Sequence, residues 1–76
     1  MQHHSPADVE QLRNAVSELA HELAEALTAA NAYLEASQQL ESRGDPARLH
    51  EAITNAIEQT KRAAEVVVKL RSIASP

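Results

Sequence analysis

A single turn signal divides this chain of 76 residues, because its one glycine, Gly44, is followed directly by Asp45 and Pro46. The other prolines lie near the two ends, so two long stretches contain no residue that breaks a helix. Gly44 can adopt the left-handed conformation that ends a helix, and Asp45 can cap the next helix. We predict a first helix over about residues 6–42, a turn over 43–45, a second helix over about 46–74, and tails at 1–5 and 75–76.

Apolar residues recur along the first predicted helix at alternating spacings of three and four, which is the pattern of a helix that packs along a seam. A serine takes one position of this seam. With Val9 at position a of the heptad, His21 falls at position f and points away from the seam. The seam residues are Val9, Leu12, Val16, Leu19, Leu23, Ala26, Ala30, Tyr33, Ser37 and Leu40.

The second predicted helix has a broader apolar face, which suits a helix with two neighbours, as in a four-helix bundle. A turn this short makes the helices antiparallel. A chain below roughly 70 to 80 residues gains little stability from its own core, so we expect oligomerisation. The predicted fold is all-α: an antiparallel helical hairpin that homodimerises into a four-helix bundle. The broad face comprises Leu49, Ile53, Ala56, Thr60, Ala63, Val67, Leu70 and Ala74, widened by Ile57, Ala64, Val66 and Ile73.

Composition argues against several classes of function. The chain has no cysteine, so nothing favours an oxidising compartment, and we expect a cytoplasmic location. The longest aliphatic run covers residues 66–68, far short of the roughly 20 residues of a membrane span, so we expect no membrane contact by this segment. A net charge of −4 disfavours nucleic acid as a partner.

The strongest candidate for a reactive side chain is His21, which lies mid-helix among Glu18, Glu22 and Glu25. A neutral imidazole beside a carboxylate is a competent nucleophile, because the carboxylate can orient the ring and take its proton. The zinc-protease pattern H-E-x-x-H lacks its second histidine here, and we expect no metal site. The residues alone leave open whether His21 serves a partner or is only solvated.

Charge is divided between the helices, with acids dominating the first and cations the second. Pairing between neighbouring helices explains this division without any function, at tenths of a kcal/mol per exposed pair. The antiparallel register also brings Lys69 and Arg62 near His21, where cations could steady a phosphate. Both interpretations stay open at this stage.

The segment around His21 resembles the H-box of bacterial sensor histidine kinases, in the branch whose motif reads A-H-E-L-N-Q-P-L-T-A. It reads L-A-H-E-L from residue 19, L-T-A from residue 27 and N-A-Y-L-E-A from residue 31. Residues 56–60 (A-I-E-Q-T) and 62–71 (R-A-A-E-V-V-V-K-L-R) are similar to the closing helix of that branch, A-x-E-Q-x-x-R-A-x-x-I-I-x-x-L-R. The resemblance covers nearly the whole chain and implies a dimerisation and histidine-phosphotransfer (HisKA/DHp) domain.

The resemblance implies that His21 is the phospho-acceptor and Glu22 its acid/base neighbour. It also implies an ATP-binding domain, in cis or in trans, that brings ATP and Mg²⁺. We expect no cofactor in this chain itself, which has no glycine-rich phosphate loop. The phosphate would pass to an aspartate of a response-regulator receiver domain. The predicted regulator-docking residues are Glu25, Thr28, Ala32 and Glu35.

The chain departs from the branch where Ala24, Glu25 and Ala26 replace N-Q-P. Without the proline, the helix should run straight past the histidine. Glu25 stands where many members carry a threonine or asparagine that positions water for dephosphorylating the regulator, so we expect a poor phosphatase. These departures keep an alternative open, namely a non-catalytic dimerisation or kinase-regulating hairpin that has lost phosphotransfer.

Overall fold

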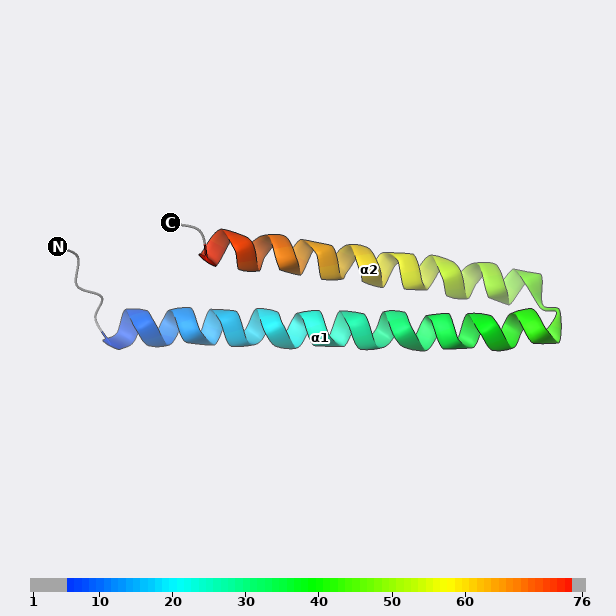
Figure 1. Cartoon of the computed structure of the whole chain (residues 1–76), viewed down its shortest axis with the longest axis horizontal. Helices are drawn as coiled ribbons and strands as arrows, with labels where there is room; N and C mark the ends of the chain where they lie inside the picture. The colour runs from blue at the N-terminus through cyan, green and yellow to red at the C-terminus, as the bar shows by residue number, and fades with distance from the viewer. Residues whose placement is uncertain (1–5, 75–76) are drawn as a thin grey trace.

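The computed structural model describes residues 6–74 as two long helices, α1 (Pro6–Arg43) and α2 (Pro46–Ala74). The helices run antiparallel, side by side (Figure 1), and residues 6–74 contain no strand. This confirms the predicted all-α hairpin. α1 continues one residue beyond the expected end at 42, and the expected tails at 1–5 and 75–76 lie outside the described residues.

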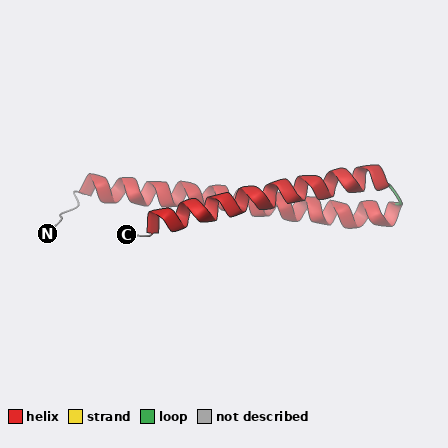
Figure 2. Ribbon diagram, turned by 90° about the horizontal axis from the view of Figure 1, so that it is seen from above, coloured by secondary structure: helices red, strands yellow, loops and turns green. Residues whose placement is uncertain are grey.

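The hairpin is a thin rod of 64 × 17 × 12 Å. Seen from above, the helices cross at a shallow angle (Figure 2). Because α1 has 38 residues and α2 has 29, the first turns of α1 extend beyond the end of α2 (Figure 1). Val9 and Leu12, in these first turns, are exposed although they occupy predicted seam positions.

The turn is built from the local chemistry that its sequence predicts. Gly44 has a φ of 68°, the left-handed conformation, and its N–H donates to the Glu41 carbonyl at 3.1 Å. The Asp45 N–H donates to the Leu40 carbonyl at 3.1 Å, which completes a Schellman motif at the end of α1. The Asp45 carboxylate Oδ1 then accepts the Arg48 N–H at 3.2 Å and caps α2.

The contact between the helices is built mainly from alanine. Small side chains let two helices approach closely, but they contribute little apolar area. Val66 is the one buried apolar residue larger than alanine within 6–74. Ser37 is also buried, as its seam position predicts, and its hydroxyl donates to the Tyr33 carbonyl at 2.8 Å. The buried apolar residues are Ala26, Ala30, Ala52, Ala56, Ala63 and Val66.

The seam predicted for α2 is confirmed at Ala56 and Ala63, which are buried, but differs from the buried face at other positions. Ile53 and Val67 were expected in the seam but are exposed, while Ala52 and Val66, one residue earlier, are buried. The broad apolar face of α2 explains this difference, because α1 covers only one half of it. The uncovered half continues onto α1 and forms an apolar flank, which we define as Leu27, Leu34, Ile53, Ile57 and Val67.

Candidate functional site

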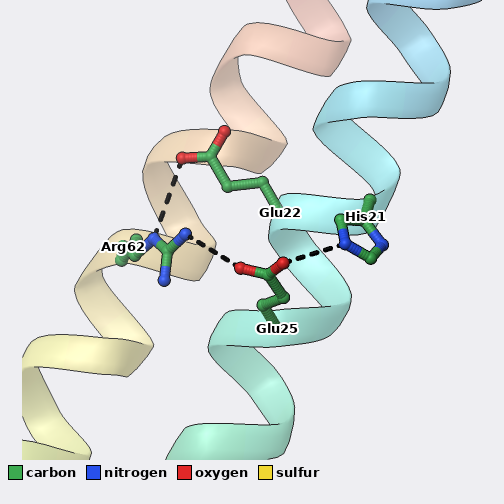
Figure 3. Close-up of polar contacts among 4 residues, drawn as sticks. All are labelled: His21, Glu22, Glu25 and Arg62. Carbon is green, nitrogen blue, oxygen red and sulfur yellow. Dashed lines mark ion pairs between the residues drawn. The ribbon is translucent and has the colours of Figure 1, made fainter.

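His21 lies on the outer side of α1, and 78% of its side chain is exposed. Figure 3 shows the ring projecting away from α2. This is the orientation that heptad position f predicts. The imidazole is therefore accessible to a partner while the helix that carries it is held by its contact with α2.

The carboxylate beside the ring belongs to Glu25. Its Oε1 lies 2.9 Å from His21 Nε2 (Figure 3), because residues four apart lie one turn apart on the same side of a helix. Neighbouring residues do not face one another in this way. The Glu22 carboxylate accordingly points to α2, where its Oε1 lies 3.7 Å from Arg62 Nε. The acid/base role expected of Glu22 stays a prediction, and the contact with the ring comes from Glu25.

Arg62 connects the two acids from the other helix. Its Nη2 lies 3.7 Å from Glu25 Oε2, so the arginine lies between Glu22 and Glu25 (Figure 3). The antiparallel register brings Arg62 to this level of α1, as the sequence predicts. Lys69, the other predicted cation, is exposed and forms no ion pair with the residues that the structure describes.

Four polar side chains form a chain of contacts that runs from His21 through Glu25 and Arg62 to Glu22. All four side chains are partly open to water, with exposed fractions from 38% for Glu22 to 78% for His21. Solvent screening limits such pairs to tenths of a kcal/mol each. The chain therefore acts mainly on the orientation of the side chains, and contributes little to the stability of the hairpin.

A shallow depression borders His21 on the outer surface of α1. It contains three of the predicted docking residues, Glu25, Thr28 and Ala32. Glu35 is not part of it, and its carboxylate accepts a bond from Asn31 Nδ2 at 3.3 Å. The prediction missed Ala24 and Ala29, which complete the depression. Their spacing of three and eight residues from His21 on the same helix is the sequence signal that would have found them.

Two further properties bear on the site. Within residues 6–74, no cluster of three or more histidine, aspartate or glutamate side chains is arranged to hold a metal ion. Neither described helix combines the length and the apolarity that crossing a bilayer requires.

Comparison with known proteins finds no matching family model, and no curated protein or solved structure with significant similarity to the chain. The resemblance to histidine-phosphotransfer domains therefore rests on the motif residues themselves. The chemistry of the site is an exposed imidazole held by one carboxylate, with a guanidinium behind that carboxylate.

Proposed function

We propose that this chain is the dimerisation and phospho-acceptor domain of a two-component sensor histidine kinase and works in the cytoplasm. The observation that carries the proposal is the exposed His21 ring with the Glu25 carboxylate 2.9 Å from its Nε2. A histidine that is both accessible and oriented by a carboxylate meets the two requirements of a nucleophile that serves another domain.

The reaction has two transfers. In the first, a ring nitrogen of His21 attacks the γ-phosphorus of ATP, which a separate catalytic domain binds together with Mg²⁺. A nitrogen–phosphorus bond forms, the bond to the bridging oxygen breaks, and ADP leaves with the electron pair. The ring proton passes to a carboxylate. In the second, an aspartate oxygen of a receiver domain attacks the same phosphorus, and the histidine leaves as neutral imidazole once a proton returns to its ring.

The surface beside His21 supports docking of a receiver domain. The depression is lined by Ala24, Ala29 and Ala32, whose short side chains let another domain approach the ring closely. The Glu25 carboxylate lies beside the ring that would carry the phosphoryl group. Repulsion between like charges favours passing that group onward rather than retaining it.

The apolar flank supports the homodimer. Each of its five residues is exposed in the single hairpin, and the hairpin buries hardly any side chain larger than alanine within 6–74. A second copy packed against this flank would cover the free half of the α2 face and give a four-helix bundle. His21 lies on a different side of α1 from Leu27 and Leu34, so dimerisation would leave the ring accessible.

The proposal is tested by phosphoryl transfer in trans. The full chain is incubated with Mg²⁺, labelled ATP and the isolated ATP-binding domain of a histidine kinase of the same H-box branch. We expect acid-labile label on the wild type and on His50→Gln, and none on His21→Gln. Circular dichroism should give equal helicity for all three proteins.

A second function is favoured by one observation, the presence of Ala24, Glu25 and Ala26 in place of the motif's N-Q-P. In this alternative the chain is a non-catalytic hairpin that dimerises or regulates a kinase. If wild-type protein takes no label from the kinase domain or from a phosphorylated receiver domain, the alternative is correct and the first proposal is wrong.

A further inference from the structure

Arg62 links α2 to both acids beside His21 (Figure 3). Its Nη2 lies 3.7 Å from Glu25 Oε2, and its Nε lies 3.7 Å from Glu22 Oε1. Glu25 in turn contacts the His21 ring, through an Oε1–Nε2 distance of 2.9 Å. A guanidinium presents five N–H donors in one rigid plane, so it can hold two carboxylates at once. The orientation of the ring therefore depends on a side chain of the other helix.

On one side of Arg62, α2 is held firmly against α1. Val66 follows Arg62 by one helical turn, and only 1% of it is exposed. Because the helices are antiparallel and Arg62 contacts Glu22 and Glu25, this turn of α2 lies beside the turn of α1 that carries His21. Val66 is therefore the main packing contact between the helices at the level of the candidate site.

On the other side of Arg62, the contact between the helices contains an unpaired polar group. Gln59 precedes Arg62 by about one turn, and its Oε1 is buried without a hydrogen-bond donor among residues 6–74. Nearly all buried acceptors in folded proteins are paired, and an unpaired one weakens the packing around it. Arg62 thus lies between a tightly packed turn at Val66 and a poorly satisfied turn at Gln59.

We propose that Arg62 is a positioning residue that makes the reactivity of His21 depend on how closely α2 packs against α1. This inference rests on the proposed function of His21 as a phospho-acceptor. Close packing keeps the guanidinium beside Glu25, whose carboxylate then orients the ring. Looser packing withdraws the guanidinium, and Glu25 and the ring gain rotational freedom. Because these pairs are partly exposed to water, the effect is a change of about two- to threefold, and not an on–off switch.

Two substitutions change the packing in opposite directions without removing any charged group of the site. Val66→Ala deletes buried apolar atoms and should lower the urea midpoint of the full chain. Gln59→Met replaces the unpaired amide with an apolar chain of similar length and should raise the midpoint. The matched controls are Val68→Ala and Gln39→Met, which make the same substitutions at exposed positions and should leave the midpoint near that of wild type.

Two readouts follow the site in each variant. Three-bond NMR couplings give the rotamer populations of the His21 side chain, and labelling by the ATP-binding domain gives the initial rate of phosphoryl transfer. Val66→Ala should broaden the rotamer distribution and lower the rate by about two- to threefold, the scale of an exposed ion pair, and Gln59→Met should do the reverse. In an Arg62→Ala background, neither substitution should change the rotamers or the rate any further, because the link between the helices is already absent.

The failure of this inference differs from a failure of the proposed function. Effects of Val66→Ala and Gln59→Met that persist at full size without Arg62 overturn the inference, as do His21 rotamers that do not follow the urea midpoint. If Val66→Ala loses its helicity, Gln59→Met decides the question, because it makes the hairpin more stable. Rotamers that follow the packing in a protein that takes no label overturn the proposed function, and leave the control of ring orientation by Arg62 in place.

Discussion

Leu34 of α1 and Ile53 of α2 border the same open groove on one side of the hairpin, and both side chains are exposed. Leu27 lies two turns before Leu34 on the same side of its helix, and Ile57 lies one turn after Ile53. Large aliphatic residues from both helices thus form one continuous surface. Surfaces of this kind mark association sites in small proteins.

The first prediction is that the chain is a homodimer through this flank. Ile57→Asp should weaken the dimer by at least about 2 kcal/mol, because association would bury an unpaired carboxylate. Light scattering or sedimentation at micromolar concentration gives the oligomeric state. The matched control is Thr54→Asp, which adds the same charge at an exposed position off the flank and should leave the dimer intact.

The outcome that contradicts this prediction is a well-folded wild-type monomer at micromolar concentration. If the Ile57→Asp and Thr54→Asp dimers dissociate equally, this would also count against the flank as the dimer interface. The added charge, and not its position, would then explain the dissociation of both variants. Loss of helicity on dissociation is expected, since a single hairpin buries little besides alanine within residues 6–74.

The hairpin itself could be predicted because its determinants are local. Gly44 and Asp45 act through their own backbone and side-chain geometry, so their roles are readable without tertiary information. The α2 seam could not be predicted in the same way. Its apolar face is wide enough for two partners, and periodicity does not say whether Ala52 or Ile53 faces α1.

The candidate site shows the same division between local and tertiary information. The contact between His21 and Glu25 follows a spacing of four residues on one helix and is visible in the sequence. The resemblance instead directed attention to Glu22, the adjacent acid. Arg62, and not Lys69, contacts both Glu22 and Glu25. This choice depends on the register and rotation of α2, which are properties of the packed hairpin.

The second prediction concerns the left-handed residue of the turn. Gly44→Ala should destabilise the protein by about 1 kcal/mol, because a side chain at a φ of 68° is strained even though nothing lies within 4 Å of an added Cβ. Gly44→Asn should have a smaller effect, since asparagine tolerates this conformation. Urea denaturation measures both. Equal midpoints for wild type and Gly44→Ala would show that the turn relaxes without strain.

The third prediction tests the contact between the helices at the site. Arg62→Ala frees Glu25 from α2, so Glu25 should orient the His21 ring less well, and the initial rate at which His21 takes label from the ATP-binding domain should fall. The loss of stability should stay below about 1 kcal/mol, because both ion pairs are partly exposed. The control is Lys61→Ala, which removes the neighbouring exposed cation. A labelling rate that responds equally to both substitutions would argue against a specific role for Arg62.

The last prediction is that this domain is a poor phosphatase. Dephosphorylation of an aspartyl phosphate needs a neutral group that holds a water molecule in line with the phosphorus. Glu25 lies one turn after His21, its side chain is 54% exposed, and its carboxylate would repel an incoming phosphoryl group. Phosphate should therefore flow from His21 to the regulator with little loss to water.

The measurement is release of inorganic phosphate from a phosphorylated receiver domain in the presence of the full chain. Wild type should add little to the spontaneous rate, and Glu25→Thr should accelerate the release, since threonine is neutral and can bind water. Glu18→Thr is the matched control, because it makes the same substitution about one turn before His21 and should leave the rate near that of wild type. Rapid release by wild type, unchanged in Glu25→Thr, would mean that another residue faces the phosphate in the complex with the regulator.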